Sequence, residues 1–375
     1  VLVYSLLPDM YHYQRLFRVI NMLKKQILQP ILLFALLLLY SQLLFASQTN
    51  IPEKNWHILG LFDGENTELE RICLYNINQL EQVDSRFAKI VVVFDRTYNQ
   101  KEDSTVRIYD IIRDSDKTEI ISNSISIGER DMGLADVLDE FLGKYFGRKN
   151  ILVIKAHGYG IISPPSLKVG YNTPQDPLVI SHVLQHRLIR PVEVMVFDSC
   201  NMASVEVAYE FKGLVSVMVA SQDLMYYSMD INNGMTYSSR PGIDYIDLVL
   251  KLSPHSNPLT IGKDVVASFI RLVSRKDAMY YKATISALDL DSLDIKPLKR
   301  LAVTLREGMA APATRNRYVD ALTYTLEHAS RFQPIGEQRY LTHYDIEDFY
   351  DVLETRLDKR LDRPKSCVIQ SYSNN

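Results

Sequence analysis

Cysteines are scarce in this 375-residue sequence, and neither sign of charge dominates it. Its three cysteines, Cys73, Cys200 and Cys367, are too few for a disulfide framework, and no two of them have the spacing of metal ligands. Lys plus Arg is 42 against 45 Asp plus Glu, so the chain lacks the basic excess typical of a nucleic-acid-binding protein. Apolar residues make up 47%, which excludes an intrinsically disordered chain.

Motifs of several common enzyme classes are also absent. There is no Gly-x-Ser-x-Gly elbow and no glycine-rich loop that ends in lysine, which argues against a serine hydrolase and a nucleotide hydrolase. His182 and His186 lie one helical turn apart, but no glutamate follows His182 and no third ligand is evident. The sequence therefore predicts no metal site. It also has no internal repeat and no low-complexity linker.

The first 47 residues have the layout of a secretory signal peptide. Four basic residues precede an apolar run over residues 31–46, and the run ends in the small residues Ala46 and Ser47. We expect cleavage after Ala46, and the alternative is an uncleaved membrane anchor. In either case the rest of the chain is exported, so we expect a secreted, periplasmic or cell-surface protein.

Apolar runs alternate with helical patterns between residues 56 and 220. The runs predict buried strands at Trp56–Phe62, Ile90–Phe94, Asn150–Ile154, Val192–Phe197 and Val215–Ala220. An alternating stretch predicts an edge pair at Thr105–Ile112. Helices are predicted at Leu69–Leu80, Leu134–Tyr145, Pro177–Leu188 and Ala203–Phe211. This order predicts an α/β fold with a mainly parallel β-sheet that helices cover on both faces.

Beyond residue 230 the pattern becomes mostly helical. One strand is expected at Ala283–Leu288, and helices are expected at Ile243–Leu252, Ile261–Val273, Leu298–Glu307, Arg317–His328 and Ile346–Leu357. We therefore divide the exported chain into an α/β core, residues 48–230, and a helical C-terminal extension of the same unit, residues 231–362, that packs on it. The tail, residues 363–375, is expected to fray.

Two of the predicted strands end in residues suited to nucleophilic catalysis. His157 and Gly158 follow one buried strand, and Cys200 follows the next. Because the carboxyl ends of parallel strands meet at one edge of a sheet, we expect these residues to lie close together. A thiolate, an imidazole that shuttles its proton, and the backbone N–H groups of Gly158 and Cys200 suffice for cysteine-dependent hydrolysis. The amino end of helix 203–211 is expected to favour the thiolate.

Each of these features alone has a simpler structural interpretation. A cysteine after a buried strand often only fills the core, and a His-Gly pair often only forms a turn. Their joint placement on strands of matching direction favours the catalytic interpretation.

A longer pattern surrounds the histidine and the cysteine. It consists of His157-Gly158-x-Gly160 after an apolar strand, followed by the run Asp198-x-Cys200-x-Met202-Ala203-Ser204-Val205-Glu206. This pattern resembles the clostripain family of cysteine peptidases. Counterparts also occur at Ser221-Gln222 and in the closing helix, so the resemblance extends over roughly residues 55–360.

The resemblance implies a caspase–hemoglobinase-like fold and a peptidase that cleaves after Arg or Lys. It assigns Cys200 as the nucleophile, His157 as the general base and acid, and Asp198 to the pocket for the residue before the scissile bond. A desolvated carboxylate there pairs well with a basic side chain, although the alternative is that Asp198 only caps helix 203–211. Further substrate-binding candidates are Ser221, Gln222, Asp223 and Asp230.

The resemblance also bears on maturation, cofactors and partners. Members are often zymogens that cleave themselves between the histidine and the cysteine, and Lys168, in a loop with two prolines, is a better candidate than Arg187 or Arg190. No cofactor is expected, and although calcium stimulates members of the family, no loop has a calcium-binding spacing. We expect a monomer that acts on protein or peptide substrates, binds no nucleic acid and contacts a membrane only through an uncleaved N-terminal segment.

The sequence departs from the family at the rim of the substrate site. Ile161-Ile162 replaces the aromatic residue common after the His-Gly motif, and Gly234-Met235-Thr236-Tyr237 lacks the family's tryptophan. Two alternatives therefore stay open. One is a catalytically inactive caspase-like module that binds or scaffolds other proteins, and the other is a legumain-like peptidase with non-basic specificity.

Overall fold

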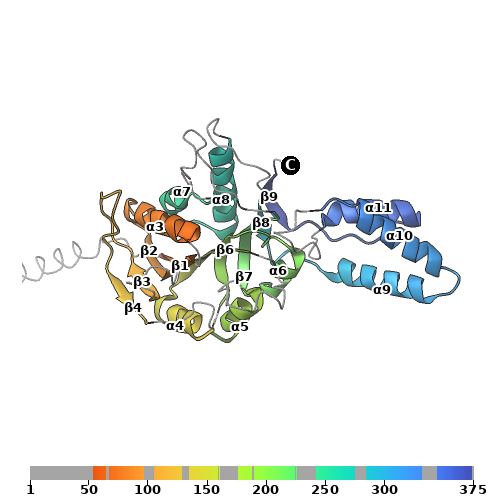
Figure 1. The fold of residues 1–375 in the computed structure, drawn as a ribbon, viewed down its shortest axis with the longest axis horizontal. Coiled ribbons are helices and arrows are strands. Elements are labelled where there is room, and N and C mark those ends of the chain that lie inside the picture. Colours follow the sequence, from red (N-terminus) through yellow and green to blue (C-terminus); the bar gives the residue numbers. More distant parts are fainter. Residues whose placement is uncertain are drawn as a thin grey trace, which may run out of the picture. The chain divides into compact units, whose positions relative to one another are not determined.

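A mixed β-sheet organises the part of the chain that the structure, a computed structural model, describes (Figure 1). The described residues are 54–64, 67–96, 105–128, 135–158, 160, 176–187, 190–223, 225, 242–274, 284–331 and 344–373. Among them, nine strands pair in the order β4-β3-β2-β1-β5-β6-β7-β8-β9.

The middle of this sheet is parallel. β1 (Trp56–Gly64) pairs with β2 (Ala88–Arg96) on one side and with β5 (Lys149–Lys155) on the other. β6 (Val192–Asp198) and β7 (Val215–Ala220) continue the sheet beyond β5. Side chains on both faces of these strands are buried, as expected for parallel strands covered on both sides. The buried strands predicted from the apolar runs are therefore confirmed.

Antiparallel strands flank the parallel centre at both edges. β3 (Arg107–Asp110) pairs with β2 and with the short strand β4 (Ser124–Ser126), which confirms an edge pair that begins within residues 105–112. At the other edge, β8 (Thr284–Asp289) pairs with β7, and β9 (Val368–Ser373) pairs with β8. The fold is thus α/β with a sheet that is parallel only in its middle.

Helices cover both faces of the sheet, each through its own buried apolar cluster. One face is covered by α3 (Thr67–Glu81), α7 (Tyr245–Lys251) and α8 (Pro258–Val273). The other face is covered by α4 (Ala135–Tyr145), α5 (Pro177–Arg187) and α6 (Val205–Glu210). This arrangement confirms the predicted layers and leaves the carboxyl ends of the parallel strands as a common edge.

The last three helices form a cluster of their own. α9 (Lys296–Ala310), α10 (Arg315–His328) and α11 (Ile346–Leu357) bury Leu301, Tyr350 and neighbouring apolar residues among themselves. Within the described residues this cluster includes no residue of the sheet, so the expectation that the helical extension packs on the sheet is correct for α7 and α8 only. No helix in the described part of the chain is long and apolar enough to cross a membrane.

Strand β9 shows that the prediction of a frayed tail is wrong. Residues Val368–Ser373 pair along β8, and the ring of Tyr372 meets Phe269 of α8 with 6.3 Å between centroids. Without β9, the outer side of β8 has an unpaired row of backbone N–H and C=O groups. An extended tail satisfies these groups, which explains why this segment of mixed polarity forms a strand.

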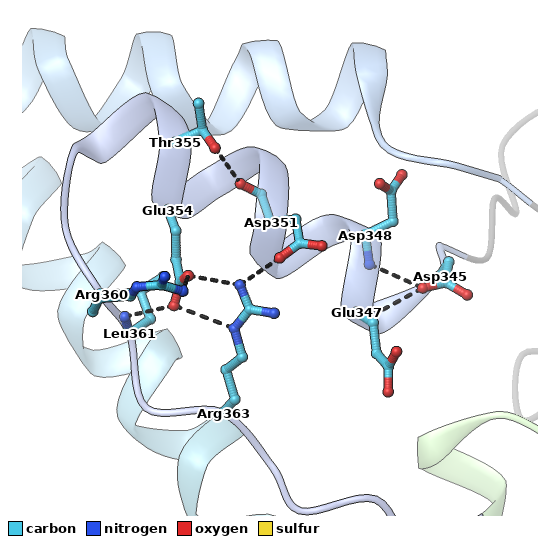
Figure 2. Close-up of polar contacts among 9 residues, drawn as sticks. All are labelled: Asp345, Glu347, Asp348, Asp351, Glu354, Thr355, Arg360, Leu361 and Arg363. Atoms are coloured by element: carbon cyan, nitrogen blue, oxygen red, sulfur yellow. Dashed lines mark hydrogen bonds and ion pairs between the residues drawn. The ribbon is translucent and has the colours of Figure 1, made fainter.

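A carboxylate near the end of α11 holds the segment that leads to β9 (Figure 2). Glu354 accepts hydrogen bonds from the Arg363 guanidinium at 2.6 Å and from the backbone N–H of Leu361 at 2.8 Å. Arg363 also donates to Asp351 at 2.6 Å. The hydrogen bonds from Arg363, reinforced by the other donors, lower the pKa of Glu354 to about 2. The network therefore fixes the path of the chain after α11.

Replacing Glu354 by glutamine is expected to lower the free energy of local opening of this segment by about 2 kcal/mol at pH 7, because the charge-assisted hydrogen bonds are lost. The folded-state pKa lies below the ordinary value of 4.5, so the contribution is full above about pH 4.5 and disappears as the pH falls toward 2. Amide hydrogen exchange of α11 in the wild type and in Glu354→Gln measures this difference. A gap between the two proteins that stays constant from pH 6 to pH 3 contradicts the assignment.

Candidate active site

The two strands predicted to carry catalytic residues are neighbours in the sheet. β5 and β6 pair in parallel, with Lys155 opposite Asp198 at their carboxyl ends. His157 follows two residues after Lys155, and Cys200 follows two residues after Asp198. Both His157 and Cys200 are half-buried. The structure therefore places the histidine turn and the cysteine turn side by side at one edge of the sheet.

The backbones of the two turns touch at Gly158. A Cβ atom on this residue would lie 1.9 Å from the carbonyl oxygen of Cys200 and 2.8 Å from its backbone nitrogen. These distances are far inside van der Waals contact with backbone atoms, so only glycine fits here. The close approach that glycine permits here is to the Cys200 backbone, which lies against the histidine turn.

The surroundings of the Cys200 thiol favour its protonated form. Its sulfur accepts a hydrogen bond from the backbone N–H of Met225 at 3.1 Å. Burial raises the pKa of Cys200 to about 11, and the nearby charges of Asp198 and Asp223 also raise it, whereas the Met225 N–H lowers it. At neutral pH the thiol therefore needs a base to become a nucleophile, and His157 is on the adjacent turn.

Helix α6 begins later in the chain than predicted. The helix begins at Val205, five positions after the cysteine, and has only six residues. Ser204 caps it, since its hydroxyl accepts the hydrogen bond from the backbone N–H of Val207. Burial and two acids raise the pKa of Cys200 overall, so the expected lowering by the helix stays a prediction. The alternative that Asp198 caps this helix is wrong, because Ser204 is the cap.

Asp198 is paired inside the protein. Its carboxylate oxygen Oδ2 lies 2.5 Å from Nζ of Lys155 and accepts a hydrogen bond from the Tyr245 hydroxyl at 2.7 Å. Asp198 and Lys155 are both completely buried. Sequence reasoning overlooked Lys155 and Tyr245. The available signal was a lysine at the end of the apolar strand Asn150–Lys155, where a buried cation requires a partner.

The loop after β7 is hydrogen-bonded to the cysteine turn. The backbone N–H of Asn201 donates to the carbonyl of Asp223 at 3.1 Å, and that of Ala203 donates to the carbonyl of Ser221 at 2.8 Å. Asn201 has a φ of 54°, a left-handed conformation that asparagine adopts more readily than most residues. These bonds set the position of the turn that carries Cys200.

Thr284, the first residue of β8, braces the same loop. Its hydroxyl oxygen accepts from the backbone N–H groups of Gln222 and Asp223, both at 3.0 Å, and lies 2.9 Å from the Ser221 hydroxyl. Ser221 and Asp223 are buried, and Gln222 is half-buried. Ser221 thus supports the loop, while the substrate-binding role suggested for Ser221, Gln222 and Asp223 stays a prediction.

Other predicted site residues lie outside the described part of the chain. They are Asp230, Lys168, and the rim segments Ile161-Ile162 and Gly234-Met235-Thr236-Tyr237. His182 and His186 are exposed, with ring centroids 4.3 Å apart. Among the described residues no group of three His, Cys, Asp or Glu side chains could hold a metal ion.

Solved structures with the same fold include an inactive zymogen protease and a secreted protease. An inactive zymogen C11 protease from Parabacteroides distasonis is similar with a TM-score of 0.54 and 14% identity, over 86% of this chain and 84% of that one. A secreted C11 cysteine protease from Bacteroides thetaiotaomicron is similar with a TM-score of 0.52 and 14% identity, over 86% of this chain and 87% of that one. The latter enzyme in complex with an irreversible peptide inhibitor covers 85% of each chain at a TM-score of 0.52 and 14% identity.

The amino-acid sequence itself carries the family assignment. No curated protein matches the chain. A sequence model of the clostripain family matches residues 63–374, which is most of the chain. The resemblance noted around His157 and Cys200 is thereby confirmed at the level of the family. This chain belongs to the clostripain family of cysteine peptidases, which are hydrolases that act on peptide substrates.

Proposed function

We propose that this chain is an exported cysteine endopeptidase in which Cys200 is the nucleophile and His157 is the proton shuttle. The observation that carries the proposal is the contact between the backbones of Gly158 and Cys200 at the ends of β5 and β6. That contact places a half-buried histidine turn against a half-buried cysteine turn. Membership of a cysteine peptidase family supports catalysis over the inactive binding module.

The proposed reaction uses these residues and water. His157 takes the thiol proton, and the sulfur attacks the carbonyl carbon of the scissile bond while the N–H groups of Gly158 and Cys200 serve as oxyanion donors. The imidazolium then gives the proton to the leaving amine as the C–N bond breaks, which leaves a thioester on Cys200. His157 deprotonates a water molecule, which hydrolyses the thioester and restores the thiol.

Two finer points, export and activation by cleavage, belong to the same proposal. The relative described as secreted supports export, and the relative described as an inactive zymogen supports activation by cleavage, for which Lys168 is the candidate. Cleavage after Arg or Lys with Asp198 as the pocket acid is implied by the family resemblance. That specificity is a prediction from the sequence and stays outside the proposal, because Lys155 already pairs with the carboxylate on which it depends.

Covalent labelling with a peptide-based electrophile tests the proposal, because only an assembled site presents the thiol to such a reagent. The full chain is incubated with a peptidyl acyloxymethyl ketone at pH 7, before and after limited trypsin treatment, and the adduct is mapped by mass spectrometry. We expect it on Cys200 and not on Cys73 or Cys367, whose pKa values burial also raises. An adduct on another cysteine, or none in either sample, supports the inactive module.

Iodoacetamide provides the matched control, because this small reagent does not use a peptide-binding site. Its reaction with Cys200 reports the resting thiol, so labelling is expected to be slow at pH 7. The rate is expected to rise about tenfold per pH unit until the pH approaches the thiol pKa of about 11. Rapid labelling by both reagents at pH 7 indicates a thiolate already present before substrate binds.

A further inference from the structure

A lysine of the protein itself pairs with the acid that the family resemblance assigns to the substrate pocket. Nζ of Lys155 lies 2.5 Å from Oδ2 of Asp198, and both side chains are 0% exposed. The Tyr245 hydroxyl donates to the same oxygen, and Lys155 lies 6.0 Å from the centre of the Tyr245 ring. The Asp198 charge is therefore balanced by a cation and a hydrogen bond from inside the fold.

The pair adjoins the proposed catalytic residues. Lys155 stands two residues before His157, and Asp198 stands two residues before Cys200. The second carboxylate oxygen of Asp198 faces Gly242, since a Cβ atom there would lie 3.0 Å from it. A substrate side chain that reached Asp198 would therefore also meet the charged nitrogen of Lys155.

We propose that Lys155 takes the place of a basic substrate side chain at Asp198, so that the enzyme cleaves after uncharged residues. This inference rests on the proposed peptidase function and deepens it. A buried ion pair has no net charge to attract Arg or Lys. A second cation beside it meets electrostatic repulsion from Lys155. Lys155 thus selects against basic substrates by repulsion as well as by neutralising the acid.

The direct test compares kcat/KM on peptides that differ only in the residue before the scissile bond. In the wild type we expect Gln and Leu peptides to be cleaved faster than Arg and Lys peptides. Lys155→Met keeps most of the side-chain length but removes the charge, and the Arg-to-Gln ratio is expected to rise about 100-fold. A wild type that prefers Arg or Lys, or a ratio that Lys155→Met leaves unchanged, overturns the proposal.

Two further variants distinguish the effect of the Lys155 charge from a general disturbance of the fold. Lys149→Met changes a lysine at the opposite end of β5, bonded to the carbonyl of Pro254, and is expected to leave the Arg-to-Gln ratio unchanged. The double variant Lys155→Met/Asp198→Asn removes both charges and leaves no unpaired buried ion, so it folds even if Lys155→Met does not. It is expected to keep the wild-type preference for uncharged residues. An Arg preference in the double variant contradicts the proposed role of the acid.

A binding measurement keeps this inference distinct from the peptidase proposal. In a Cys200→Ala background, argininamide is expected to raise the melting temperature only when Lys155→Met is also present. If no peptide is cleaved yet this shift appears, the peptidase proposal fails and the assignment of Lys155 stands. Equal stabilisation with and without Lys155, or none in either protein, overturns the assignment of Lys155 whatever the peptide assay shows.

Discussion

Replacing Cys200 by alanine is expected to abolish peptide hydrolysis, with a loss of about 10⁴-fold or more in kcat. The substitution removes the sulfur that forms the thioester. The backbone N–H of residue 200 stays, and with it the contact to Gly158, so the protein is expected to fold. Steady-state kinetics on the best wild-type peptide measure the loss, and circular dichroism checks the fold.

Cys367→Ala is the matched control for this experiment. Cys367 is half-buried just before β9, where its side chain packs at the border of an apolar cluster and its carbonyl oxygen accepts a hydrogen bond from the backbone N–H of Asp289. Alanine preserves that hydrogen bond, so activity close to that of the wild type is expected. If Cys200→Ala keeps kcat within tenfold of the wild type while the control behaves as expected, Cys200 is not the nucleophile.

A methyl group at position 158 is expected to reduce activity by about 10³-fold. The Cβ of Gly158→Ala would lie 1.9 Å from the carbonyl oxygen of Cys200, so the two turns must move apart. That movement displaces the N–H groups proposed for the oxyanion, and loss of one such donor typically costs 10²–10³ in kcat. Measuring kcat and KM separately distinguishes the cause, since a displaced donor lowers kcat more than it raises KM.

Gly143→Ala is the matched control for Gly158→Ala. In α4, an added Cβ approaches only the guanidinium of Arg187, at 3.1 Å, and this flexible group can move. Alanine also favours a helix over glycine by about 1 kcal/mol. The variant is therefore expected to be at least as stable as the wild type and fully active. If Gly158→Ala is equally active, the two turns do not need to touch for catalysis.

The strands of the parallel centre are predictable because burial on both faces leaves continuous apolar runs, such as Ile90–Phe94 in β2. β9 is not predictable in the same way. Its residues, Val368–Ser373, include as many polar as apolar side chains and no continuous apolar run, and they form a strand because β8 offers an open edge far away in the sequence. Similarly, nothing in the individual patterns of α9, α10 and α11 indicates that they bury their apolar faces in one another.

The candidate site likewise combines features that the sequence predicts with features that it does not. The ends of two neighbouring parallel strands are readable from the sequence, so His157 and Cys200 could be placed at one edge in advance. The Lys155–Asp198 pair joins residues 43 positions apart, and Tyr245 reaches it from α7. Hydropathy assigns a lysine to the surface by default, so its burial becomes visible only when the partner strand is in place.

The antiparallel direction of β8 has a topological consequence for the chain between it and β7. β7 ends, and β8 begins, at the edge that carries Cys200, where Thr284 binds the loop of Ser221. The connection through α7 and α8 therefore leaves the sheet and returns to it at the same edge. Outside α7 and α8, which pack on the sheet, this connection can change in length without altering the register of the sheet, while both of its anchors stay fixed beside the nucleophile.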